Sequence, residues 1–340
     1  MRSPDKNRYL RAARHIEAPD VPFFELEADP VIVSAMLGKP VDLALHSYEL
    51  PIPDVVEWNG RMGNDMAYLG HIWRLGRKEM RDADGRRHYV DGTMKTPASL
   101  TDIWFPDLTA FRRRLEALFA HLDGTGVGVM AATTSVGFIV ATAIGYQDFC
   151  LAVIENPGFV AEFRDRVEEY ALRELEIILS YPVDGVRIGS GLITNSGPML
   201  NPEMMERYEY RSMRKQAAMI KAAGKALTFH IDGKVDRVLP ILIEMGADVL
   251  NPIDPCGGQQ DIYEVKRRWG KQIALHGNID ISGVLLKGTP GQVADDVCRH
   301  LDVLSRGGGY IAASSHDLHQ LLPVANIYAM RDAVHEWRGG

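Results

Sequence analysis

Polar side chains follow four predicted strands in the second half of this 340-residue chain, each where an apolar run ends. The expected strands cover residues 226–230, 247–251, 273–276 and 310–313. The polar residues that end or follow them are His230, Asp232, Asn251, His276, Asn278, Asp280 and His316. Side chains of these types bind metal ions, transfer protons and hydrogen-bond substrates. The pattern predicts one chemical site assembled from several strand ends.

His230 and Asp232 are one residue apart, so in an extended segment both side chains point to the same side. This pair could bind one metal ion or share one proton, or it could serve only a turn. With His316, the set becomes two imidazoles and a carboxylate, which suits a catalytic Zn²⁺ with one open position. The same residues could act as acid and base without a metal. We expect His230, Asp232 and His316 to be catalytic residues and candidate zinc ligands.

A second polar group comprises His276, Asn278 and Asp280, to which we add Asn251 from the preceding strand end. We expect these four residues to contact the substrate. The alternative is turn chemistry, because Gly277-Asn278 is a typical turn dipeptide and an Asp at position 280 could cap a helix. Cys256 lies in a Gly-rich loop, where a lone cysteine is more often neither ligand nor nucleophile.

Short apolar strands alternate with longer amphipathic helices from residue 107 onward, which is typical of a parallel α/β sheet. A (β/α)8 TIM-type barrel with an N-terminal elaboration fits best, and a doubly wound open sheet is the alternative. No GxGxxG follows the first clear strand, which argues against a dinucleotide-binding fold. We expect residues 1–340 to form a single domain. Residues 1–106 would hold the elaboration and two early strands, and residues 107–340 the clear βα repeats.

Three local patterns refine this expectation. Residues 77–98 are polar and contain Asp84-Gly85, which favours a hairpin or a set of turns. Asn201 followed by Pro202 predicts the start of a helix over residues 202–223. The mostly apolar run over residues 127–144 contains Gly, Ser and Thr, so we expect a buried strand and the segment after it rather than a membrane span.

Charge and cysteine usage narrow the class of function. The chain has 38 Lys and Arg against 45 Asp and Glu, a net charge of −7, with no long basic run. This argues against nucleic-acid binding. Its three cysteines form no CxxC pair, and the charged first 20 residues have no apolar core typical of a signal peptide. We expect a cytoplasmic protein without a membrane partner.

Five segments, in this order, resemble the uroporphyrinogen decarboxylase superfamily, over about residues 124–337. They are AIGYQDFCLAVIENPGFV (143–160), DGVRIGSGLITNSGPMLNPEMMERY (184–208), FHIDGKVDRVLPILIEMGADVLNPIDP (229–255), GKQIALHGNIDISGVLLKGTP (270–290) and GGGYIAASSHDLHQLLPVANI (307–327). That superfamily contains the decarboxylase and corrinoid-dependent methyltransferases, and the resemblance implies a (β/α)8 barrel.

The chain departs from both well-known branches. Decarboxylases begin with an arginine-rich segment for the porphyrinogen carboxylates, whereas this chain has only scattered Arg8, Arg11 and Arg14. Thiol-activating methyltransferases bind zinc through a His-x-Cys and a late Cys. Here Asp232 stands at the first Cys position and His316 near the second. The resulting harder ligand set suits oxygen-bearing substrates, and the His-x-Asp-Gly motif resembles the O-demethylase branch.

The resemblance therefore implies a methyltransferase that moves a methyl group from a small donor to the cobalt of a separate corrinoid protein. A methoxylated aromatic is the expected donor. The expected cofactors are Zn²⁺ in this chain and a corrinoid carried by the partner, and a homodimer is compatible with this reading. The alternative is a metal-independent decarboxylase of an aromatic or tetrapyrrole acid, which would have a cationic pocket. A non-catalytic binding module is a third reading.

Overall fold

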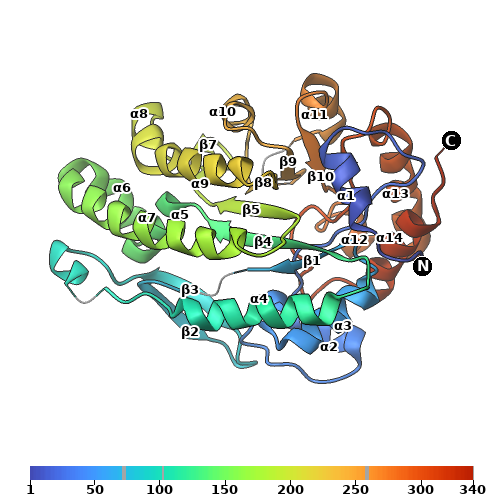
Figure 1. The fold of residues 1–340 in the computed structure, drawn as a ribbon, viewed down its shortest axis with the longest axis horizontal. Helices are drawn as coiled ribbons and strands as arrows, with labels where there is room; N and C mark the ends of the chain where they lie inside the picture. Colours follow the sequence, from blue (N-terminus) through green and yellow to red (C-terminus); the bar gives the residue numbers. More distant parts are fainter. Residues whose placement is uncertain (71–73, 102, 257–259, 340) are drawn as a thin grey trace.

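The computed structural model describes residues 1–70, 74–101, 103–256 and 260–339, and its centre is a parallel sheet. Seven strands follow the order β1-β4-β5-β8-β9-β10-β11, which is also their order along the chain (Figure 1). They are β1 (Met66–Leu69), β4 (Gly128–Thr134), β5 (Gly185–Ser190), β8 (Ala226–Ile231), β9 (Val249–Pro252), β10 (Ala274–His276) and β11 (Tyr310–Ile311). Helices return the chain between strands, so every pair in this sheet is parallel.

Residues 22–28 close this sheet into a barrel. On one side, the Ala312 N–H donates to the Pro22 carbonyl at 2.9 Å, and the Phe24 N–H donates to the Ala312 carbonyl at 3.2 Å. On the other side, the Asp65 N–H donates to the Phe23 carbonyl at 2.9 Å, just before β1. The segment fills the eighth position between β11 and β1. The expected (β/α)8 barrel is confirmed, and the early strands are this segment and β1.

Helices surround the barrel and begin at capping residues. The Asp107 side chain accepts from Thr109 N at 2.8 Å, and Thr289 forms a capping box with Gln292. The principal helices are α1 (Lys6–Ala13), α2 (Pro30–Leu37), α3 (Ile52–Met62), α4 (Leu108–Leu122), α5 (Val136–Ile144), α6 (Tyr146–Glu155), α7 (Pro157–Leu179), α9 (Arg211–Ala222), α10 (Leu239–Glu244), α11 (Ile262–Trp269), α13 (Pro290–Leu304) and α14 (Val324–Glu336), with short turns α8 (Pro202–Met205) and α12 (Val284–Lys287).

The expected helix over residues 202–223 is interrupted. Asn201 caps its start as predicted, accepting from Met204 N at 2.9 Å. A π-helical turn, η3 (Glu206–Tyr210), then separates α8 from α9 and turns the fully buried Glu209 inward. The Glu209 carboxylate accepts a 2.5 Å hydrogen bond from Ser190 Oγ at the end of β5.

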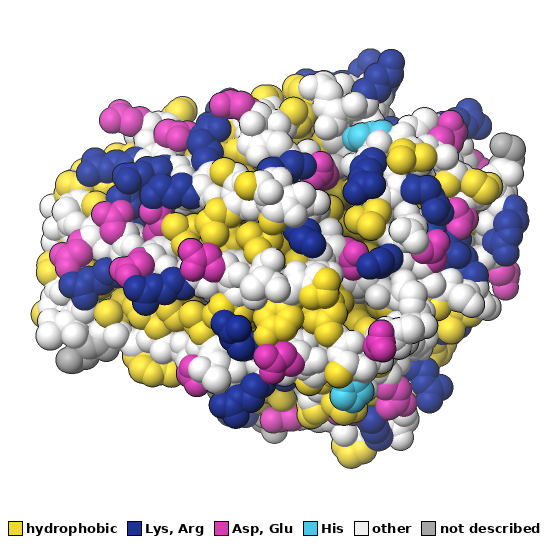
Figure 2. Space-filling view, viewed as in Figure 1, with side chains coloured by type: hydrophobic (Ala, Val, Ile, Leu, Met, Phe, Trp, Pro, Cys, Tyr) yellow, Lys and Arg dark blue, Asp and Glu magenta, His cyan; other side chains and the backbone are white. Residues whose placement is uncertain are grey.

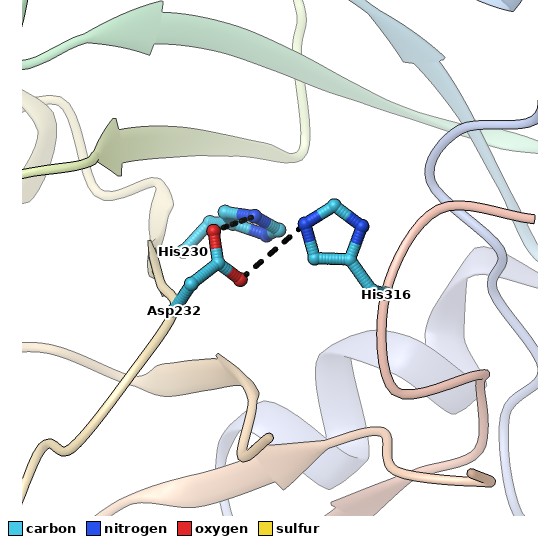
Figure 3. Close-up of side chains that lie close together, drawn as sticks. All are labelled: His230, Asp232 and His316. Atoms are coloured by element: carbon cyan, nitrogen blue, oxygen red, sulfur yellow. Dashed lines mark ion pairs between the residues drawn. The ribbon is translucent and has the colours of Figure 1, made fainter. Parts of the chain in front are cut away.

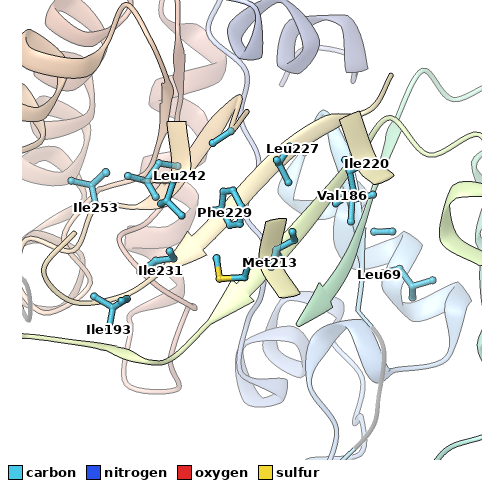
Figure 4. Close-up of a cluster of buried hydrophobic side chains, with 14 of the residues drawn as sticks. Leu69, Val186, Ile193, Met213, Ile220, Leu227, Phe229, Ile231, Leu242 and Ile253 are labelled. Atoms are coloured by element: carbon cyan, nitrogen blue, oxygen red, sulfur yellow. The ribbon is translucent and has the colours of Figure 1, made fainter. Parts of the chain in front are cut away.

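Alternate residues of each strand divide the core into two layers. Figure 4 shows the outer layer, in which Leu227 and Phe229 of β8 lie beside Met213 of α9. The intervening residues, Thr228 and His230, therefore face the barrel interior. An inner layer contains Phe24, Leu26, Met66, Met130, Val249 and Ile311, together with Tyr9 from α1. The Tyr9 hydroxyl lies 2.7 Å from Thr228 Oγ1, so α1 plugs the closed end of the barrel.

The mouth lies where the strands end. The predicted hairpin is confirmed there, after β1, as β2 (Arg77–Arg81) and β3 (Arg87–Gly92), with Gly85 at φ +88° in the turn. A small ribbon, β6 (Ile193–Thr194) and β7 (Gly197–Pro198), follows β5. In Figure 1, the hairpin, α6 and α8 lie towards the end opposite both termini.

The surface in Figure 2 mixes positive and negative side chains, with hydrophobic side chains between them. Among the described residues, no single helix has the length and apolar character needed to cross a membrane. The pair α5 and α6 meets that test only when taken together, and it is bent by 103°.

Candidate metal centre

The end of β8 carries the first of three clustered side chains. His230 is paired in register with Gly189 of β5 and with Asn251 of β9. Its Nδ1–H donates to Asn251 Oδ1 at 2.5 Å, and Asn251 Nδ2 in turn donates to the His276 carbonyl at 3.0 Å. This chain of hydrogen bonds fixes the imidazole, so the other nitrogen, Nε2, is available to the barrel mouth.

Asp232 and His316 complete what we call the His–Asp cluster (His230, Asp232 and His316). The Asp232 carboxylate lies 3.6 Å from His230 Nε2 through one oxygen and 3.6 Å from His316 Nε2 through the other. Figure 3 shows the three side chains directed at one another: His230 from the end of β8, Asp232 from the loop after β8, and His316 from the loop after β11. One ligand atom from each lies within 4.8 Å of the others, which is a spacing that one metal ion can span.

The electrostatics of the cluster favour a charged pair. Burial would raise the pKa of Asp232, but the two neighbouring imidazoles outweigh it and hold that pKa well below its usual range. The neighbouring Asp232 carboxylate raises the pKa of His316 to about 9. The Asp317 N–H lies 2.7 Å from His316 Nδ1 and donates to it when the ring is neutral, so the remaining ring proton is then on Nε2. Metal binding at Nε2 would release this proton.

The residues fit a zinc ion by two observations. Asp232 Oδ1 is buried, and among the described residues it has no hydrogen-bond partner. The donor set of two imidazoles and one carboxylate is that of catalytic zinc sites, which leave a fourth position open. The hydrogen bond from Asn251 to His230 supplies the outer support typical of such sites.

The cluster opens into a cavity of about 310 Å³, here called the mouth cavity. Its other lining residues are Glu27, His46, Tyr48, Glu49, Arg74, Arg77, Thr134, Phe138, Arg187, Gly189, Ser190, Gly191 and Asp317. Arg187 Nη1 donates to the Tyr68 hydroxyl at 2.6 Å and lies 3.6 Å from Glu27. Burial and the nearby Asp317 raise the pKa of Glu27, although Arg187 opposes this shift.

Sequence reasoning missed Glu27, Arg77 and Arg187. Arg187 gave a usable signal, because it is a charge inside the otherwise apolar strand β5. Glu27 belongs to the segment that closes the barrel, and its neighbours form only isolated bridges rather than a regular strand. Nothing in the local sequence marks Arg77 among the other charges of its hairpin.

The remaining predicted substrate contacts lie outside the lining of the mouth cavity. His276 is fully buried, its ring stacks on Phe24, and its Nε2–H donates to the Phe24 carbonyl at 2.7 Å. Asn278 Nδ2 donates to the Ile253 carbonyl at 2.7 Å. Asp280 accepts from the Ser282 and Gly283 N–H groups, as the turn alternative predicts. Asn251 supports His230, and a substrate contact for these four residues stays a prediction.

Cys256 is exposed, and its Sγ lies 3.2 Å from Asp280 Oδ1. The thiol is not among the lining residues of the mouth cavity. Burial and Asp280 raise its pKa, and this disfavours the thiolate that a nucleophile or ligand would need.

Comparison with known proteins identifies the family. The sequence model of the uroporphyrinogen decarboxylase (URO-D) family matches residues 95–337, which is well over half of the chain. The chain therefore belongs to the uroporphyrinogen decarboxylase family.

Individual relatives are similar over shorter stretches. A uroporphyrinogen decarboxylase of Neisseria gonorrhoeae is 33% identical over 143 residues, covering 41% of this chain and 39% of the relative. That of Salmonella agona is 32% identical over 98 residues, covering 29% of this chain and 26% of the relative. The matched stretches thus span about two fifths of the relatives' length or less.

One solved structure is similar over nearly its whole length. It is a methyltransferase from Methanosarcina mazei, with a TM-score of 0.78 over 98% of this chain and 99% of the other. The sequence identity is 15%, so this likeness supports the barrel fold and no particular reaction.

Proposed function

We propose that the chain is a metal-assisted methyltransferase, which moves a methyl group from a methoxylated aromatic donor to the corrinoid of a separate protein. The observation that carries the proposal is the His–Asp cluster at the mouth, with an unpartnered Asp232 oxygen and an oriented His230. The fold likeness to a methyltransferase adds support without specifying the reaction. The proposal treats residues 1–340 as one cytoplasmic barrel domain.

The cavity charges favour this proposal over decarboxylation of a tetrapyrrole acid. Among the described lining residues, Arg74, Arg187 and His316 each lie beside an acidic side chain, which leaves one arginine, Arg77, without such a partner. A polycarboxylate would need a surplus of cations to offset its desolvation and its repulsion by these acids. A small donor with little or no negative charge avoids this cost.

The residues of the chain have distinct roles in the proposed reaction. His230, Asp232 and His316 would hold a zinc ion, which supplies Lewis-acid polarisation of the ether oxygen of the donor. Asn251 keeps His230 in the binding tautomer. Glu27, whose raised pKa favours a protonated carboxyl, lines the same cavity and provides a proton for the oxygen that leaves. The methyl carbon–oxygen bond breaks, and that oxygen ends as a hydroxyl.

Apolar side chains at the mouth support a protein partner. Four large hydrophobic side chains are exposed: Met80 and Val90 on the hairpin, Trp104 before α4, and Ile154 of α6. The hairpin follows β1 and α6 belongs to the connection after β4, so both lie on the side where strands end. We propose that the corrinoid protein binds over this rim, because exposed apolar clusters mark interaction surfaces.

The test is methyl transfer with zinc-supplemented protein, a panel of methoxylated aromatics and free cob(I)alamin, followed by the absorbance of methylated cobalamin. We expect transfer by the wild type and a fall of about 1,000-fold or more in the His230→Ala, His316→Ala double variant. His121→Ala, which removes an exposed histidine of α4, is the matched control and retains activity. If no donor is demethylated while a tetrapyrrole acid loses CO₂, the decarboxylase reading is correct instead.

A further inference from the structure

Arg77 is the first residue of β2 and lines the mouth cavity on the hairpin side. Its guanidinium carbon lies 5.9 Å from the centre of the Phe138 ring, which also lines the cavity. The arrangement brings a permanent positive charge and an aromatic face together in one wall. The N–H groups of the Arg77 guanidinium remain available to bind an anion in the cavity.

The other arginines and the acidic side chains of the described cavity lining each lie beside a group of the opposite type. Arg74 lies 2.7 Å from Glu49, and Arg187 lies 3.6 Å from Glu27. Asp232 and Asp317 lie 3.6 Å and 3.9 Å from His316. Arg77 differs, because within the described part of the chain no carboxylate lies within the 4.0 Å of a salt bridge. A cation in a concave site without a counter-charge is a position for an anionic ligand.

A strip without large side chains leads from the His–Asp cluster to Arg77. Gly189 pairs in register with His230, and Ser190 and Gly191 continue from it along the cavity lining. Gly191 lies against the Phe138 ring so closely that an added Cβ would come within 2.4 Å of it. The strip therefore adds no large side chain of its own between His230 and Phe138, and the contact with Gly191 holds the Phe138 ring in place.

We propose that Arg77 is a specificity-determining residue that binds a carboxylate on the far side of the donor from its methoxy group. The donor class is then a methoxylated aromatic acid, with its ring in the mouth cavity beside Phe138. This inference rests on the proposed function for the role of the methoxy group. The carboxylate site itself rests only on the position of Arg77 and its lack of a counter-charge.

The test is equilibrium binding by calorimetry, without cobalamin, of the methoxybenzoate isomers and the matching methoxybenzamides. The amides keep the shape and remove the charge. We expect the best benzoate to bind wild-type protein about 10- to 100-fold more tightly than its amide, which is the range for a hydrogen bond to a charged group. Arg77→Gln should abolish this difference, and Arg77→Lys should restore part of it.

Lys78→Gln is the matched control. Lys78 neighbours Arg77 on β2, is exposed and is not among the residues that line the cavity, so its loss removes the same charge elsewhere. The benzoate preference should survive in this variant. Equal binding of benzoate and amide to the wild type, or an unchanged preference in Arg77→Gln, would overturn the inference.

These outcomes separate the inference from the proposed function. An Arg77-dependent benzoate preference without any methyl transfer would retain the carboxylate site and reject the methyltransferase. Methyl transfer from neutral donors, with no effect of Arg77→Gln on either binding or rate, would retain the methyltransferase and reject the carboxylate site.

Discussion

The closed end and the mouth of the barrel hold their carboxylates in different ways. At the closed end, Asp65 accepts from Arg8 Nη1 at 2.8 Å and from the Asp5 and Phe23 N–H groups at 2.8 and 3.2 Å. At the mouth, Asp232 faces two imidazoles at 3.6 Å, and its Oδ1 has no hydrogen-bond partner in the described structure. The closed end satisfies its charge within the fold, whereas the mouth leaves ligand atoms for another species. The closed end therefore contributes to the stability of the barrel, and the mouth provides the groups for function.

The largest effect is expected for Arg8→Ala, at the closed end. It leaves the fully buried Asp65 without its main counter-charge, and removing one partner of a buried pair costs about 3–5 kcal/mol. We expect the free energy of unfolding to fall by about 3 kcal/mol in urea denaturation. Zinc affinity of the folded variant should be unchanged. A comparable loss of zinc affinity would mean that the two ends are not independent.

Two histidines at different depths of the barrel have pKa values shifted in opposite directions. At the mouth, Asp232 raises the pKa of His316 to about 9, whereas burial beneath it lowers the pKa of His276 to about 4. Between pH 6.5 and 4, the unfolded chain takes up a proton that folded His276 refuses. Stability therefore falls as pH falls through this window, by about 3 kcal/mol from His276.

The measurement is urea denaturation of wild type and His276→Gln at pH 7, 6, 5 and 4. The variant should show a smaller loss of stability between pH 7 and pH 4. His335 is also buried, and its lowered pKa adds to the slope of both proteins, so the difference between them isolates His276. Parallel curves would contradict the neutral, buried state of His276.

The smallest expected effect concerns support for the cluster. Asn251→Ala removes the acceptor that orients His230, and loss of such an outer partner typically weakens metal binding about 10- to 100-fold. Asn251→Asp keeps an oxygen acceptor and should recover most of the affinity. Competition with a chromophoric zinc chelator gives both values. Unchanged zinc affinity in Asn251→Ala would show that the His–Asp cluster does not need the hydrogen bond from His230 to Asn251.

The sequence predicts a site residue well where a polar residue directly ends a short apolar strand. His230 lies at the end of a short apolar run, so its position at the mouth could be predicted without knowledge of the strand register. The role of the next strand end could not, because the closure of the barrel by residues 22–28 brings the Phe24 carbonyl to His276. Glu27 on that segment was missed for the same reason.

Arg77 illustrates a second limit. Its hairpin was predicted, but whether a hairpin residue faces solvent or the cavity depends on how β3 packs against α5. The barrel itself, in contrast, was predictable because alternating strands and helices admit few arrangements.

The most direct test of the central claim is the metal content of protein purified without chelator and then supplied with zinc. Mass spectrometry should find about one zinc per chain, the stoichiometry of a mononuclear site. The His230→Ala, His316→Ala double variant should hold none. A wild type that holds no more zinc than this variant would contradict the account, and the cluster would then be an acid–base site.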